Sequence, residues 1–79
     1  MACSKVHVTE VTWLLDAPVG ELRCEAKFRY RQASKPVTVT LHADNTAIVV
    51  TDEPVFGVSP GQAAVFYDGD RVLGGGWIR

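Results

Sequence analysis

The clearest pattern in the chain is a strict alternation of apolar and charged side chains between residues 22 and 31. The apolar positions are Leu22, Cys24, Ala26, Phe28 and Tyr30, and the charged positions between them are Arg23, Glu25, Lys27, Arg29 and Arg31. This period of two is typical of an antiparallel strand with one face on the core and the other in water. Residues 22–32 are therefore predicted to form one strand of a sheet.

Shorter runs with the same period follow along the chain, and none shows sustained helical periodicity. Further strands are predicted at residues 6–14, 37–42, 47–51, 63–67 and 71–73, with a short extended piece at 55–58. The apolar phase changes near Glu10, which predicts a bulge or bend. Residues 59–62 have Pro60 and Gly61 at the two central positions, as a type II turn requires.

About six short strands without helices predict an all-β fold, a small closed antiparallel barrel. Closure removes the exposed edges that a small open sheet would leave. Three glycines, Gly74, Gly75 and Gly76, interrupt the last run. They do not open a helix, so they lack the amide array of a phosphate-binding loop. They are predicted instead to allow close packing against a neighbouring strand.

The length and composition restrict what such a domain can do. A chain of 79 residues buries only about 60% of its unfolded surface, which leaves little room for a deep catalytic cleft. The formal net charge is −1, so the overall charge gives no support for nucleic-acid binding. No secretory signal or membrane-length apolar run occurs, and we interpret the chain as cytoplasmic.

The residue types that usually carry catalysis or bind metals are scattered. Cys3 and Cys24 do not form a CxxC pair, and Cys24 is interpreted as a small apolar residue on the inner face. His7 and His42 stand apart from one another and from other metal ligands. We therefore predict no catalytic residue, no metal site and no cofactor in this chain.

Charge is unevenly distributed, and this is the first indication of a binding surface. Four of the eight basic residues lie between Arg23 and Arg31, while most acids occur in predicted turns. A positive stripe on a β surface can neutralise phosphates, and Tyr30 could stack on a base. The alternative is a solvated outer face without a partner. Gln62, after the Pro-Gly turn, is either a hydrogen-bonding residue for RNA or an exposed polar turn residue.

The two tryptophans also leave two interpretations open. Trp13 and Trp77 are expected to anchor the core, because a small domain needs large side chains to fill its interior. The alternative is an apolar patch that faces another domain.

Two segments resemble a known family. The first is the run from Ser59 to Asp70, SPGQAAVFYDGD, followed by VLGGGWI at residues 72–78. The second is RCEAKFRYRQ at residues 23–32, and Asp52-Glu53-Pro54 also fits. Together they resemble the C-terminal signature of bacterial tRNA-specific 2-thiouridylases, the MnmA/TrmU family. The likeness covers nearly the whole chain from Val6 onward.

The resemblance implies a translation-factor-like barrel at the end of a longer enzyme. Residues 1–5 are then a linker, and residues 6–79 are a C-terminal RNA-contacting domain. Enzymes of this family use ATP and Mg to adenylate the wobble uridine of tRNA, and a cysteine persulfide, supplied by a sulfur-relay donor, delivers sulfur. Their nucleotide loop and catalytic cysteines belong to an N-terminal catalytic domain, so this chain alone is expected to be inactive.

The resemblance also assigns roles to residues of this chain. Arg29, Tyr30 and Gln62 match family positions that contact RNA, and Lys27, Arg31 and Arg23 are expected to add general attraction for tRNA. Two alternatives remain open: a generic oligonucleotide-binding barrel, and a purely structural domain that braces a catalytic domain. A membrane partner is not expected.

Overall fold

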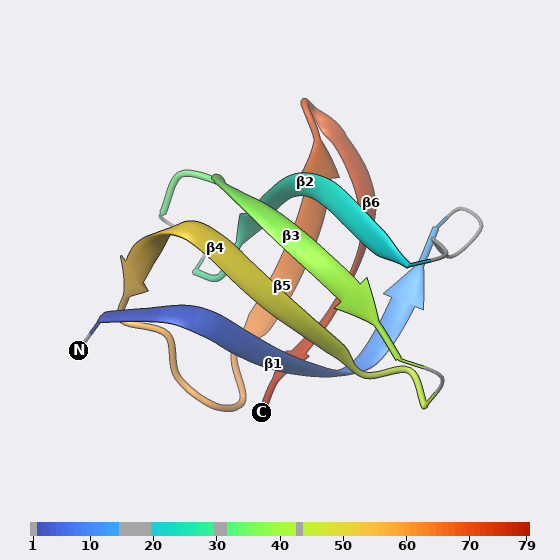
Figure 1. Ribbon diagram of the computed structural model, residues 1–79, viewed down its shortest axis with the longest axis horizontal. Helices are drawn as coiled ribbons and strands as arrows, with labels where there is room; N and C mark the ends of the chain where they lie inside the picture. Colours follow the sequence, from blue (N-terminus) through green and yellow to red (C-terminus); the bar gives the residue numbers. More distant parts are fainter. Residues whose placement is uncertain (1, 15–19, 30–31, 43) are drawn as a thin grey trace.

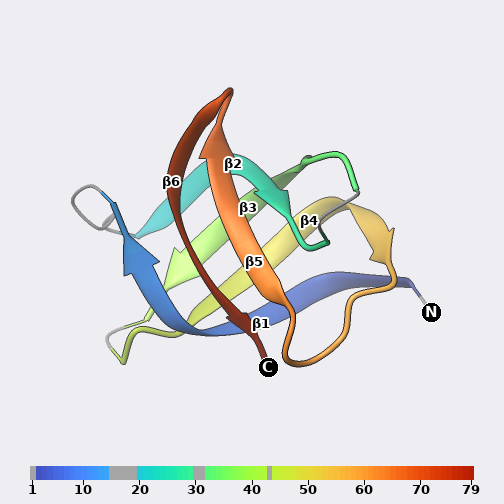
Figure 2. The same ribbon diagram turned by 180° about the vertical axis from the view of Figure 1, so that it is seen from behind.

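The computed structural model describes residues 2–14, 20–29, 32–42 and 44–79, and over these residues the chain forms a closed antiparallel barrel of six strands (Figures 1 and 2). The strands are β1 (Ala2–Trp13), β2 (Glu21–Lys27), β3 (Lys35–Leu41), β4 (Ala47–Phe56), β5 (Ala63–Asp68) and β6 (Arg71–Ile78). Their order around the barrel is β1-β4-β3-β2-β5-β6, and β6 pairs with β1 to close it. The predicted all-β barrel is confirmed.

β1 takes part in both halves of the barrel because it bends in its middle. Its first part pairs with β4, and its second part, from Val8 to Trp13, pairs with β6. Between Thr9 and Thr12 the register with β6 shifts, and Glu10 has a positive φ of 53°. This is a β-bulge, which increases the bend of a strand. The bulge predicted near Glu10 is confirmed.

The core is formed by the side chains at alternate positions of the strands, which point into the barrel. Phe28 and Phe66 are the largest fully buried side chains, and Val8, Val37, Val39 and Val49 surround them. On β2 the apolar face predicted from the sequence points inward: Ala26 is buried, and Leu22 and Cys24 pack against the core. Burial raises the pKa of the Cys24 thiol to about 11, so the thiol stays protonated near neutral pH. The side chain of Cys3 lies outside the description.

The three glycines of β6 lie where neighbouring backbone leaves no space for a side chain. A Cβ added to Gly74 would overlap the carbonyl oxygen of Thr12 on β1. A Cβ at Gly75 would lie 2.5 Å from the carbonyl oxygen of Ala64 on β5. At Gly76 the nearest atom, 2.6 Å away, is the carbonyl oxygen of Thr9. The predicted close packing is confirmed, and β6 runs through the glycines without interruption.

Several strand ends differ from the prediction. β1 begins at Ala2 instead of residue 6, and β6 ends at Ile78 instead of residue 73. β2 ends at Lys27, five residues before the predicted end, so Arg29 lies beyond the ladder. β4 continues to Phe56 instead of ending at Thr51, and it includes Pro54. Pairing with β3 stops at Thr51, so beyond this point β4 pairs only with β1. A proline is tolerated there because one side of the strand needs no N–H donor.

The two tryptophans have different environments. The Trp13 ring stacks on Phe66 with 5.4 Å between the ring centroids, and it packs against the core. The Trp77 side chain is 50% exposed, so its predicted core position is wrong. No helix in the described part of the chain has the length and apolar character needed to cross a membrane.

Candidate functional site

A groove of about 860 Å³ lies on the outside of the barrel, along β5 and beyond the end of β2. Figure 2 views the molecule from the side on which β5 and β6 lie nearest the reader. The groove is lined by Lys27, Phe28, Arg29, Gln32, Gln62, Ala63, Val65 and Tyr67. Three of the residues singled out from the sequence, two from the end of β2 and one from the turn before β5, therefore meet in one place.

The floor of the groove follows from the alternation along β5. Ala64 and Phe66 are fully buried, so Ala63, Val65 and Tyr67 face outward. Val65 is the register partner of Lys27 on β2. The Lys27 side chain thus stands beside an apolar floor that ends in a tyrosine. Tyr67 was not among the residues predicted from the sequence, although its alternation with buried Phe66 would have placed it on the outer surface.

Arg29 extends from the bend after β2 and lies against the connection between β4 and β5. Its side chain occupies the space that a Cβ on Gly57 would need. Gly57 has a φ of +73°, a conformation that favours glycine. The amide Nε2 of Gln32 donates a hydrogen bond of 2.9 Å to the carbonyl oxygen of Phe56. Gln32 and Gly57 therefore fix the surface on which the Arg29 side chain rests.

Gln62 is held by its own turn and by the end of the barrel. Its carboxamide oxygen Oε1 accepts a hydrogen bond of 3.3 Å from the N–H of Ser59. Its carbonyl oxygen accepts one of 2.7 Å from the N–H of Ile78. Because Oε1 is used by the turn, the Nε2 group, for which no partner is found among the described residues, is the end that can donate to a ligand.

The charged side chains that line the groove are basic. Lys27 and Arg29 line it, and no carboxylate is found among its lining residues in the part of the chain that the structure describes. Asp70 lines a smaller adjoining hollow together with Lys27 and Tyr67. The groove therefore offers cations, amide donors and apolar surface to a ligand.

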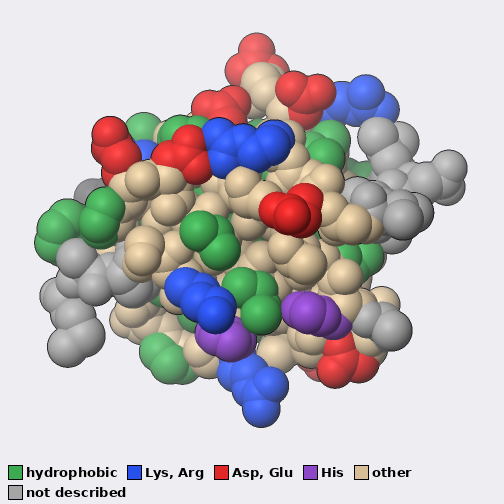
Figure 3. All heavy atoms as spheres, in the orientation of Figure 1, with side chains coloured by type: hydrophobic (Ala, Val, Ile, Leu, Met, Phe, Trp, Pro, Cys, Tyr) green, Lys and Arg blue, Asp and Glu red, His purple; other side chains and the backbone are tan. Residues whose placement is uncertain are grey.

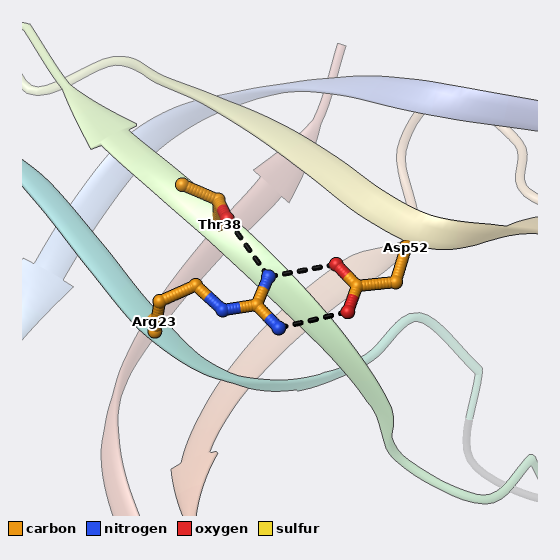
Figure 4. A network of polar contacts seen from close by, with 3 residues as sticks. All are labelled: Arg23, Thr38 and Asp52. Carbon is orange, nitrogen blue, oxygen red and sulfur yellow. Dashed lines mark hydrogen bonds and ion pairs between the residues drawn. The ribbon is translucent and has the colours of Figure 1, made fainter.

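Arg23, at the other end of the alternating segment, serves a different purpose. Its guanidinium crosses β3 and makes a two-bond pair with Asp52 on β4, with distances of 2.7 and 2.8 Å, and it donates to Thr38 at 2.9 Å (Figure 4). This pairing lowers the pKa of the Asp52 carboxyl below its usual value. Basic and acidic side chains adjoin on the face seen in Figure 3, and they form no continuous positive stripe there.

Besides Arg23, the residues predicted to contact RNA fall into two groups. Lys27, Arg29 and Gln62 lie together in the groove. Tyr30 and Arg31 lie outside the described residues, so their roles stay predictions. Within the described ranges, no group of three or more His, Cys, Asp or Glu residues could hold a metal ion.

Comparison with known proteins gives the groove a context. Residues 3–78 match the family model described as the aminomethyltransferase beta-barrel domain. The chain is 49% identical over 78 residues to the tRNA-specific 2-thiouridylase MnmA of Rhodospirillum centenum, which covers 99% of the chain and 20% of that relative. It is 49% identical over 75 residues to the corresponding proteins of Bacillus cytotoxicus and Bacillus mycoides. The chain spans about one fifth of the length of these curated relatives.

Proposed function

The chain belongs to the aminomethyltransferase beta-barrel domain family and is similar to part of tRNA-specific 2-thiouridylases, and from this we propose that it is the tRNA-contacting C-terminal domain of such an enzyme. The observation that carries the proposal is the groove in which Lys27 and Arg29, from the end of β2, meet Gln62, from the turn before β5. In this proposal the longer protein thiolates the wobble uridine of tRNA in the cytoplasm. Its other domains bind ATP and Mg and receive sulfur from a donor.

The groove has the chemistry that RNA binding requires. Lys27 and Arg29 supply positive charge for phosphates, and the Arg29 guanidinium can donate two parallel hydrogen bonds to one phosphate. The Nε2 group of Gln62 can donate to a base edge or a ribose hydroxyl. Val65 and Tyr67 supply apolar surface beside these polar groups. In this proposal the barrel holds the tRNA while residues outside this chain perform the chemistry.

The proposal predicts where tRNA changes the NMR spectrum of this chain. On titration with unfractionated bacterial tRNA, the backbone amide signals of Lys27, Arg29 and Ala63 should shift, together with the side-chain amide signal of Gln62. The signals of Thr38 and Val50, which lie on β3 and β4, should stay in place. Unperturbed groove signals, or shifts confined to β3 and β4, would overturn the proposal.

The packing of Arg29 on Gly57 provides a second prediction. Replacing Gly57 with alanine should displace the Arg29 side chain, because the new Cβ would occupy the position of its guanidinium. If Arg29 contacts a phosphate, the affinity for tRNA should fall about 10- to 150-fold, the loss expected for about 1.5–3 kcal/mol of a charge-assisted hydrogen bond. The dissociation constant is to be measured by fluorescence anisotropy with labelled tRNA.

Two controls separate this effect from general strain. Gly20 has a similar φ of +78° and nothing within 4 Å of an added Cβ, so Gly20→Ala carries the backbone strain without the displacement. Its affinity for tRNA should equal that of the wild type. In an Arg29→Ala background, Gly57→Ala should cause no further loss. A further loss of the same size would show that Gly57 does not act through Arg29.

A further inference from the structure

The described surface carries two exposed aromatic side chains, Phe56 on β4 and Trp77 on β6, that are not among the residues lining the groove described above. Trp77 on β6 is 50% exposed, although a tryptophan in a small barrel is normally needed in the core. Ile78 next to it is buried, so the strand alternation turns Trp77 outward. An indole held outside the barrel on a rigid strand is a surface available for stacking.

The strand register places this indole at the edge of the groove. Trp77 is the register partner of Ala63, which lines the groove. Both face outward, and side chains directly opposite one another in an antiparallel pair have Cβ atoms about 5 Å apart. Gly75, two residues before Trp77, pairs with Val65 and adds no side chain to the same face. The small neighbours Ala63 and Gly75 explain why the indole is left open to solvent.

Ala63, the register partner of Trp77, lies in the same groove as two basic residues. Lys27 is opposite Val65 on β5, and Arg29 follows in the bend beyond the end of β2. Both basic residues line the groove together with Ala63. The indole therefore lies next to a residue of a groove that also contains two cations.

From the exposure of Trp77 and its pairing with Ala63 we propose that Trp77 stacks on an unpaired base of the RNA whose backbone meets Lys27 and Arg29. The proposal rests on the proposed function of the groove. Single-stranded RNA is bound by surfaces that combine cations for the backbone with aromatic rings for the bases. The basic residues of the groove favour RNA over an apolar protein surface as the ligand. Within the described residues, the groove beside Trp77 is lined by two cations and no carboxylate.

The test compares two substitutions of Trp77 in this chain with unfractionated bacterial tRNA as the probe. Trp77→Leu keeps an apolar side chain but removes the ring, and the affinity for tRNA should fall about 5- to 100-fold, the range for loss of one stacked base. Trp77→Phe keeps an aromatic ring and should bind within a few fold of the wild type. Val50→Ala, which alters an exposed apolar residue on β4, should bind like the wild type.

Fluorescence gives a direct readout of contact. Emission of the wild-type chain should be quenched when tRNA is added, and this quenching should be absent in Trp77→Phe, which retains only the core residue Trp13.

Wild-type affinity of Trp77→Leu would overturn the stacking role and assign the exposed indole to a protein contact. If that result accompanies weakened binding by Arg29→Ala, the RNA-binding groove stands and only the role of Trp77 is refuted. If neither substitution changes binding, both proposals fail.

Discussion

Replacing Gly74 with alanine is expected to destabilise the barrel by about 3 kcal/mol, at the upper end of the usual cost of overpacking. The added Cβ would overlap the carbonyl oxygen of Thr12 and lie 3.0 Å from both the Cα and the ring of Trp13. A backbone oxygen cannot rotate away, so relief requires β1 and β6 to separate. These two strands close the barrel. For a domain of this size the melting temperature should fall by roughly 12–24 °C.

The measurement is thermal unfolding followed by circular dichroism, with Gly69→Ala as the matched control. Gly69 has a φ of +61° but nothing within 4 Å of an added Cβ. Alanine there carries only the left-handed backbone cost of about 1–2 kcal/mol. The Gly74 variant should therefore melt well below the Gly69 variant. Equal melting temperatures would show that β1 and β6 relieve the overlap at a cost no larger than that of a left-handed alanine, about 1–2 kcal/mol.

Much of the fold follows from local pattern, and its exceptions have physical causes. The alternation on either side of Ala26 and Phe28 identified both a strand and its inner face, because a half-buried strand repeats every two residues. The end of β4 was missed because Pro54 is normally a strand breaker. The proline is tolerated because the pairing of β4 with β3 ends at Thr51. This pairing is part of the tertiary structure, and local sequence patterns do not reveal it.

The candidate site was harder to predict from the sequence than the fold. The charge pattern predicted a stripe that included Arg23, yet Asp52, 29 residues further on, pairs with this arginine. The roles of Arg29 and Gln62 came from the family resemblance. Their meeting depends on the register between β2 and β5 and on the course of the connection after β4. Such long-range placement leaves no periodic signal in a sequence.

The position of Trp77 was also not predictable from the sequence. Hydrophobicity alone favours burial of a tryptophan, and this prediction was correct for the packing of Trp13 and wrong for Trp77. The difference is set by the bulge in β1 and by the glycines of β6, which fix the faces of the last strand. Trp77 pairs with Ala63, which lines the groove with Lys27 and Arg29, and the stacking proposal is based on this position.

The separation of Arg23 from Arg29 makes the electrostatic proposal testable. Arg29→Ala should weaken tRNA binding most at low salt, because a cation that meets a phosphate releases counterions from the RNA. The slope of log affinity against log salt concentration should become shallower by about 0.7–0.9. Arg29→Lys should keep most of the slope, since the charge remains. It should still bind more weakly, since an ammonium cannot make the two parallel bonds of a guanidinium.

Arg71→Ala is the control for net charge, because it removes one cation from the start of β6, outside the groove-lining residues. It changes the charge of the chain by the same amount as Arg29→Ala, and its slope should remain close to that of the wild type. Equal losses in the two variants would mean that tRNA senses only the overall charge of the barrel. A loss confined to Arg29 requires a contact at one place. The side chain there is supported by Gly57 and lies in the same groove as Gln62.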